Sequence, residues 1–310
     1  MLTKVSDSIK KHKVLTWSII GSVLALCAVL ITLGSFYDYQ ITDALYSKNW
    51  FAKLFTLVGN VPAMLIGVAF AACAFQYVDR SKRKVLTAFI IVLWIIESGI
   101  ASYFFWDTAQ KEVFTGMSST LGYIFMGITP IFLIAGSFFL FRLAKTRETK
   151  TKLYYIFLIL FFASFIANLV AIEGIRTFWG RPRYYTIDDI AVFFTPWYIP
   201  QGYVPGSTSF PSGHAASSTM ALSGLLFLTQ FNAKTWQKVL LIVLPVILII
   251  GTCLSRMMLG MHFLSDVTFG FLFAASLLVA SIFFTDRFCF AKIEKSLSSP
   301  ADYKANAKIK

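Results

Sequence analysis

The chain has 310 residues, of which 57% are hydrophobic and only 14% charged, with a mean hydropathy of +0.70 and a formal net charge of +13. Soluble domains average about 45–50% apolar and about 25% charged residues, so this composition excludes an ordinary soluble protein. The apolar excess falls in long runs, which predicts an all-α, polytopic membrane protein that forms one domain over residues 1–310.

Eight apolar runs are long enough to cross a bilayer as helices, which takes about 17–25 residues. In chain order, the expected spans are 15–36, 61–78, 85–105, 120–141, 153–172, 215–231, 239–254 and 263–284. The segment 37–60 reads as an amphipathic stretch in the membrane interface with aromatic anchors. The four cysteines lie in or beside apolar runs or in the basic tail, and they indicate neither a disulfide nor a zinc site.

The basic residues predict the orientation of these spans. With a cytoplasmic N-terminus, 21 of the 28 lysines and arginines lie on the cytoplasmic side, as the positive-inside rule requires. We therefore expect both termini in the cytoplasm, including a basic tail at 286–310, and the net charge needs no nucleic-acid partner. The outside residues are Lys48, Lys53, Lys111, Arg176, Arg181, Arg183 and Arg256. Four of these are arginines in two short stretches, which indicates a role other than insertion.

Three polar stretches fall on the predicted outer side, and the last of them pairs a histidine with a carboxylate. The stretches are RTFWGRPRYY at 176–185, SFPSGHAASS at 209–218 and SRMMLGMHFLSD at 255–266. His262 and Asp266 are four residues apart and share one helical face. The carboxylate can hold one ring nitrogen as N–H, which leaves the other as a nucleophile or base.

The other two stretches supply groups that suit an anion. The second opens a helix, whose free N–H groups and positive dipole end attract negative charge. There Gly213 lets the backbone approach a ligand, and Ser212 caps the helix or donates its hydroxyl. Arg176, Arg183 and Arg256 offer planar guanidinium groups for phosphate oxygens. Together these features describe a phosphoryl-transfer site that needs no metal.

Each feature also has a simpler interpretation when it is taken alone. His214 can be an interfacial residue at a helix end, His262 and Asp266 can be a structural polar pair, and the arginines can bind lipid headgroups. The convergence of all three on one side of the membrane favours a site.

Three further ionisable residues have less support from their context. Glu97 lies within the third span, where an ionisable group is a functional candidate. Glu173 precedes Arg176 by three residues and is expected to orient that arginine. His12, in the basic N-terminal segment, has no such context and receives no role.

The three stretches resemble the signature of the type-2 phosphatidic acid phosphatase superfamily, in its bacterial membrane branch. That signature is Lys-x6-Arg-Pro, then Pro-Ser-Gly-His, then Ser-Arg-x5-His-x3-Asp. The second and third blocks match fully, at 211–214 and 255–266. In the first block, Arg176 stands for the lysine and Tyr184 for the proline. An alignment on Arg181 would instead place a glycine at the basic position, so Arg176 with Arg183 is the preferred match.

The resemblance covers residues 150–285 and implies a mechanism without metal or cofactor. His262 would attack phosphorus and form a phosphohistidine, with Asp266 orienting its ring. His214 would protonate the leaving oxygen and then activate water. The phosphate oxygens would be held by Arg176, Arg183, Arg256, Ser212 and Gly213. The superfamily has a six-helix core, so we expect two extra spans at the N-terminal end.

The expected function is that of a membrane lipid phosphatase at the outer face of the plasma membrane. Its substrate would be a lipid phosphate or diphosphate, such as undecaprenyl diphosphate or phosphatidylglycerol phosphate, whose tail stays in the bilayer. Two alternatives remain: a lipid phosphotransferase that uses the same site, and a non-enzymatic protein that binds or transports lipid phosphates. Vanadium haloperoxidases share this pocket but are soluble.

Overall fold

The computed structural model describes residues 2–187 and 194–297, with the side chains of 170–172 left out. Within these ranges the secondary structure is helical and contains no strand, which confirms the all-α class. The segments before residue 188 are α1 (Val5–Lys11), α2 (Lys13–Leu45), α3 (Trp50–Gly59), α4 (Val61–Tyr77), α5 (Lys84–Thr108), η1 (Ala109–Val113), α6 (Ser119–Arg142), α7 (Arg147–Ile166), η2 (Ala167–Gly174), α8 (Ile175–Trp179) and η3 (Tyr184–Thr186). Those after it are α10 (Gly213–Thr219), η4 (Met220–Ser223), α11 (Gly224–Gln230), α12 (Thr235–Met258), α13 (Leu264–Phe288) and α14 (Phe290–Lys295).

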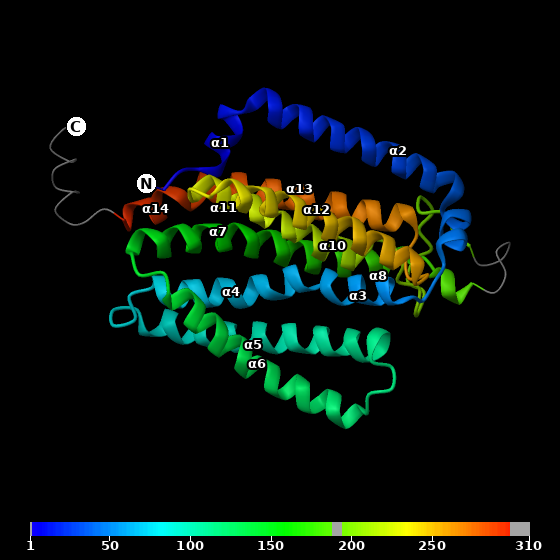
Figure 1. Ribbon diagram of the computed structural model, residues 1–310, viewed down its shortest axis with the longest axis horizontal. Coiled ribbons are helices and arrows are strands. Elements are labelled where there is room, and N and C mark those ends of the chain that lie inside the picture. The colour runs from blue at the N-terminus through cyan, green and yellow to red at the C-terminus, as the bar shows by residue number, and fades with distance from the viewer. Residues whose placement is uncertain (1, 188–193, 298–310) are drawn as a thin grey trace.

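Seven helical stretches of the described chain are long and apolar enough to cross a membrane. They are Lys13–Leu45, Trp50–Tyr77, Lys84–Val113, Ser119–Arg142, Arg147–Leu169, Thr235–Met258 and Leu264–Phe288. The expected span at 215–231 consists instead of three short segments in succession, α10, η4 and α11. These segments run beside α12 and α13 in Figure 1, and α10 packs on both of those helices.

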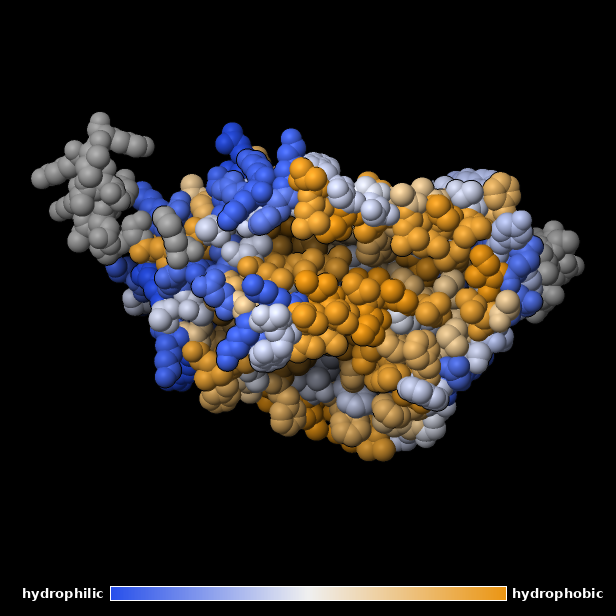
Figure 2. All heavy atoms as spheres, turned by 45° about the horizontal axis from the view of Figure 1, so that its top comes forward, coloured by the Kyte–Doolittle hydropathy of each residue, from blue (hydrophilic) through white to orange (hydrophobic). Residues whose placement is uncertain are grey.

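The surface supports a membrane setting for this bundle. Large apolar side chains are exposed along α2, α5, α6 and α12. Figure 2 shows hydrophobic residues across the middle of the molecule and hydrophilic residues gathered at its ends. A soluble monomer rarely exposes so broad an apolar surface, whereas lipid covers it at no cost. The chain is therefore a multi-pass membrane protein.

Both ends of the described chain lie at the same end of the bundle (Figure 1), where α1 and α14 pack beside α13. The basic tail expected at 286–310 begins inside α13, and the part described, up to residue 297, includes the buried residues Phe290 and Ile293 of α14. Residues 298–310 of that tail lie outside the described residues. The opposite end carries α8, the start of α10 and the link between α12 and α13.

The spans divide into a group that carries the candidate site and a pair that lies outside it. The main hydrophobic core joins α7 and α13 to α4, α10 and α11, and includes Tyr155, Ile159 and Leu278. The helices α5 and α6 pack on each other and on α4, away from α13 (Figure 1). The first span, α2, packs on α13 instead. The two spans outside the site group are therefore the third and fourth, whereas the sequence suggested extra spans at the N-terminal end.

The segment 37–60, expected to be an amphipathic stretch in the membrane interface, is helical over most of its length. Its first part continues α2 to Leu45, and its second part is α3, which leads into α4. Two glycines bring α3 close to α12: a Cβ on Gly59 would lie 2.4 Å from Thr252 Oγ1, and one on Gly251 would lie 2.1 Å from the Phe55 ring. This close packing places the polar residues of α3 near the C-terminal end of α12.

Candidate active site

The structure brings the three polar stretches together at one end of the bundle. The first stretch covers α8 and the turn after it, the second begins α10, and the third ends α12 and begins α13. Gly270 of α13 allows the close approach of the second stretch, because a Cβ there would lie 2.3 Å from the Ser212 carbonyl oxygen. The Ser212 N–H also donates to the Asp266 carbonyl over 3.0 Å.

His262 lies in the link between α12 and α13, and its side chain is only 2% exposed. Its Nδ1 is 2.6 Å from the Ser209 carbonyl oxygen. A carbonyl oxygen only accepts, so Nδ1 carries the hydrogen and donates it. The other ring nitrogen, Nε2, therefore keeps a free lone pair, which is the form that a nucleophile or base requires.

The sequence suggested that Asp266 holds this N–H directly, but the nearest carboxylate oxygen is 3.9 Å from Nδ1. That oxygen, Oδ2, accepts instead from the Phe263 N–H at 2.8 Å and from the Ser209 hydroxyl at 2.5 Å. Asp266 thus caps the first turn of α13 and fixes the segment that contains the Ser209 carbonyl. Its influence on the His262 ring is indirect.

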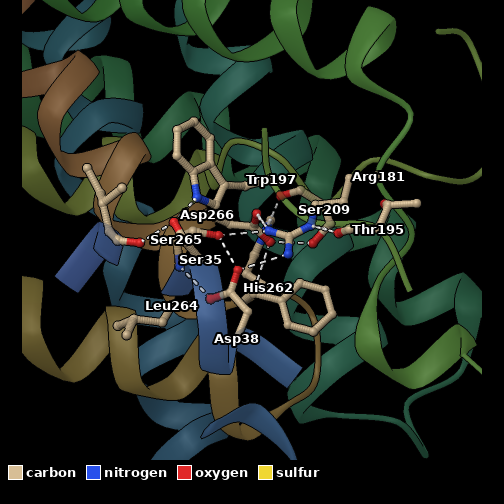
Figure 3. Close-up of polar contacts among 12 residues, drawn as sticks. Ser35, Asp38, Arg181, Thr195, Trp197, Ser209, His262, Leu264, Ser265 and Asp266 are labelled. Atoms are coloured by element: carbon tan, nitrogen blue, oxygen red, sulfur yellow. Dashed lines mark hydrogen bonds and ion pairs between the residues drawn. The ribbon is translucent and has the colours of Figure 1, made fainter. Parts of the chain in front are cut away.

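Behind Asp266 lies a buried cluster that sequence reasoning did not find (Figure 3). Arg181 is 1% exposed and forms ion pairs with Asp266 and with Asp38, the latter at 2.9 Å. It also donates to the Ser265 hydroxyl at 2.8 Å and to the Thr195 carbonyl at 2.9 Å. Asp38 accepts from the backbone N–H and the hydroxyl of Ser265 as well. Four of the five N–H groups of Arg181 are used in this way, so it is not available to a ligand.

Arg256 and Arg183, in contrast to Arg181, have N–H groups that are not donated to a carboxylate of the described chain. Arg256 is 3% exposed and, among the residues that the structure describes, its side chain donates only to the Thr56 hydroxyl, at 3.0 Å. Arg183 donates to the Thr208 hydroxyl at 3.1 Å and approaches the Met261 sulfur at 3.5 Å. Among the described residues, neither has a carboxylate within 4.0 Å, and the Nε of each is buried without an acceptor. Arg256 is buried and Arg183 is half-buried with its Nε inaccessible to solvent. A buried guanidinium nitrogen without an acceptor or counter-ion is costly, so this arrangement fits an anionic ligand.

These arginines influence the histidine electrostatically. Burial, followed by the positive charges of Arg256 and Arg183, holds the pKa of His262 well below its ordinary value of 6.5. The ring is therefore neutral at neutral pH, in agreement with the free lone pair on Nε2.

Arg176 lies on α8 at the rim of this group, and its side chain is 24% exposed. It forms an ion pair with Glu173, as the sequence suggested. Glu97 has no hydrogen-bond partner among the described residues, and it lies against Gly67 at the contact between α4 and α5. Glu97 thus lies at a contact between two helices that carry none of the three polar stretches.

The second stretch holds a capped helix start. The Ser212 hydroxyl accepts from the Ala215 N–H at 3.3 Å, so it acts as the N-cap of α10. Gly213 is the first helical residue, and its N–H has no acceptor one turn earlier in the helix. His214 follows and is partly buried, with its Nε2 3.0 Å from the Asn60 amide nitrogen.

The residues that the sequence did not indicate come from the first two spans. Asp38 belongs to α2, Thr56 to α3, and Asn60 to the junction of α3 and α4. The one local signal in the sequence was an acidic residue, Asp38, toward the C-terminal end of an apolar helix. Groups of three or more potential metal ligands are absent from the described part of the chain.

A helical membrane protein with these three polar stretches at one end of its bundle has the features of a membrane phosphatase family, and comparison with known families supports this. Residues 154–288 match the family model described as the PAP2 superfamily, and this part of the chain belongs to that superfamily. Searches of curated proteins and of solved structures gave no match. The match contains all the polar stretches but neither Asp38, Thr56 nor Asn60. Membership supports a phosphatase-type activity on lipid phosphates.

Proposed function

We propose that the protein is a membrane phosphatase that hydrolyses a lipid phosphate or diphosphate at the outer face of the plasma membrane. The observation that carries this proposal is the pairing of His262 with two unpaired arginines. The Nδ1–H group of His262 donates a hydrogen bond to the Ser209 carbonyl oxygen, so Nε2 of the same ring keeps its lone pair. Arg183 and Arg256 provide buried N–H groups that lack protein acceptors in the described chain.

The phosphate group binds first. Arg183, Arg256 and Arg176 hold its equatorial oxygens, and the Gly213 N–H at the start of α10 adds a backbone donor. The Ser212 hydroxyl, whose oxygen accepts from Ala215, still has its own hydrogen to donate. Because the lipid tail remains in the bilayer, only the headgroup enters the site.

The chemistry then proceeds in two steps. Nε2 of His262 attacks phosphorus, the bond to the lipid oxygen breaks, and protonated His214 donates its proton to that oxygen. Neutral His214 next takes a proton from water, and the resulting hydroxide attacks the phosphohistidine to release inorganic phosphate. The negative charge of bound phosphate favours protonation of His214, which the surrounding arginines otherwise oppose. No step calls for a metal or a cofactor.

Undecaprenyl diphosphate is our leading candidate for the substrate, and phosphatidylglycerol phosphate is the next. The same residues would also serve a phosphotransferase, in which an acceptor other than water takes the phosphoryl group. Release of inorganic phosphate by purified protein without an added acceptor favours hydrolysis. Phosphate release only after an acceptor lipid is added would favour transfer.

The decisive experiment measures phosphate release across a panel of lipid phosphates in detergent or nanodiscs, with and without EDTA. We expect release by the wild type in both conditions and a loss of at least about 1,000-fold in His262→Ala, which lacks the nucleophile. His12→Ala is the matched control, since His12 lies in the N-terminal segment away from the site. Unchanged release in His262→Ala would refute the mechanism.

A further inference from the structure

Asn60 stands at the junction of α3 and α4, at a position where asparagine normally caps a helix. It makes no such cap: its side chain forms no hydrogen bond with the first turn of α4. The amide nitrogen lies instead 3.0 Å from Nε2 of His214. The backbone carbonyl of Asn60 accepts from the Ser217 hydroxyl at 3.0 Å, which ties this junction to α10 a second time.

The contact determines which nitrogen of His214 faces the substrate. An amide N–H₂ group only donates, so Nε2 is the acceptor and the neutral ring carries its hydrogen on Nδ1. With Nε2 occupied by Asn60, Nδ1 is the nitrogen left for the reacting oxygen. The ring cannot turn without losing this bond.

A proton carrier needs a partner that accommodates two states of its ring. When His214 is an imidazolium, both nitrogens carry hydrogen and Nε2 needs an acceptor; when neutral, Nε2 can accept. The two ends of one amide provide both functions, because rotation of the side chain exchanges the Asn60 nitrogen for its oxygen. A carboxylate in this place would only accept and would stabilise the imidazolium. A hydrophobic residue would do neither.

We propose that Asn60 is a positioning residue for His214, which holds Nε2 in both protonation states and directs Nδ1 to the leaving oxygen and then to water. The catalytic role of His214 rests on the proposed function. The hydrogen bond between Asn60 and Nε2 of His214, and the Nδ1–H tautomer that it favours, do not depend on that function. Asn60 lies outside the part of the chain that matches the family model.

The charged groups around His214 determine how its protonation should respond to a substitution of Asn60. Arg256 of α12, Arg183 of the turn after α8, and Arg176 of α8 all act on it with positive charge. The His262 ring, between α12 and α13, is close enough to interact with it electrostatically. Among the described residues no carboxylate lies within hydrogen-bond distance of the His214 ring, so a carboxylate in place of the Asn60 amide would add a negative charge there.

The test uses nitrogen-15 NMR of histidine-labelled protein in nanodiscs, which reports tautomer and titration for each ring. The chain has only three histidines, so His214→Gln and His262→Gln assign the signals. We expect the Nδ1–H tautomer of His214 in the wild type and a mixture in Asn60→Leu. In Asn60→Asp we expect the pKa of His214 to rise by at least about one unit, since an opposite charge is added at close range.

Asn49→Asp is the matched control, because Asn49 is the N-cap of α3 and its side chain accepts from Ala52 over 3.0 Å. It should leave the His214 signals unchanged. If Asn60→Asp and Asn60→Leu both leave the tautomer and titration of His214 as in the wild type, the inference is wrong. This outcome does not depend on activity, so it is separate from a failure of the proposed function.

The kinetic counterpart uses phosphate release. In Asn60→Leu we expect kcat to fall about 10-fold to 100-fold with little change in KM, because a misoriented acid and base slows chemistry more than binding. In Asn60→Asp the alkaline limb of the pH profile should move to higher pH. Asn60→Gln retains the amide and should recover part of the activity. A wild-type pH profile in Asn60→Asp would contradict the positioning role even if that variant were less stable.

Discussion

Replacement of Asp38 by alanine tests the buried ion-pair cluster behind the candidate site. Asp38 accepts from Arg181 and from two donors of Ser265, and both ionic side chains are at most 1% exposed. Removing one partner of a buried ion pair costs about 3–5 kcal/mol. In Asp38→Ala, Arg181 keeps Asp266 as a counter-ion, which moderates the loss, while Ser265 loses its acceptors, at about 1–3 kcal/mol for each unsatisfied group. We therefore expect a decrease of about 4 kcal/mol in the free energy of unfolding.

Arg181→Met should destabilise the protein more than Asp38→Ala, because it leaves two buried carboxylates without a cation. Asp43→Ala is the matched control on the same helix: Asp43 is exposed and accepts from the Tyr184 hydroxyl at 2.5 Å. Loss of that bond should cost about 1 kcal/mol. The assay is unfolding by SDS in mixed micelles, followed by tryptophan fluorescence. Equal unfolding midpoints for Asp38→Ala and Asp43→Ala would refute the reasoning.

Three other predictions concern the site and the orientation of the chain. The pKa of His262 is lowered in the folded state, so below about pH 6.5 the unfolded chain binds a proton that the folded chain does not. The free energy of unfolding should therefore fall as the pH drops below about 6.5, and it should fall less in His262→Gln. An equal dependence of the free energy of unfolding on pH in both proteins would contradict this. Arg256→Lys should lower kcat/KM for phosphate release by about 10-fold to 100-fold, because an ammonium cannot make the bidentate contact of a guanidinium; kinetics equal to the wild type would remove Arg256 from the site. An impermeant maleimide added to intact cells should label Tyr203→Cys and not Ser81→Cys in a cysteine-free background; the reverse pattern would invert the predicted orientation.

The local features of the site were predictable because they are set by short-range spacing. The spacing of four from His262 to Asp266 predicted that the two lie close together, but the structure places His262 in the link before α13 and not on one helical face with Asp266. The block that contains Ser212 and Gly213 likewise reads as a helix start. The preference for Arg176 and Arg183 over Arg181 also followed from spacing, and in the structure Arg181 is buried with four of its five N–H groups donated to protein acceptors.

The contributions of the first two spans were not predictable in this way. Asp38 meets Arg181 across 143 positions, and Asn60 meets His214 across 154 positions. No periodicity within α2 or α3 specifies which other helix each one packs against. Both residues lie in the segment that composition assigned to the membrane interface, where polar side chains are expected to contact water. Their burial depends on close packing at residues such as Gly59, which only the assembled bundle reveals.

The ion pair between Arg181 and Asp266 also explains how His262 remains neutral although a carboxylate lies near its ring. A lone Asp266 charge 3.9 Å from Nδ1 would favour the imidazolium, which has no lone pair with which to attack phosphorus. Arg181 forms an ion pair with Asp266 and offsets that negative charge. The Nδ1–H of His262 donates to the Ser209 carbonyl oxygen and not to Asp266. Burial and the two unpaired arginines then dominate, and they lower the pKa of His262. The buried cluster thus keeps the capping function of Asp266 while limiting its electrostatic effect, and Nε2 of His262 retains the lone pair that its proposed role as a nucleophile requires.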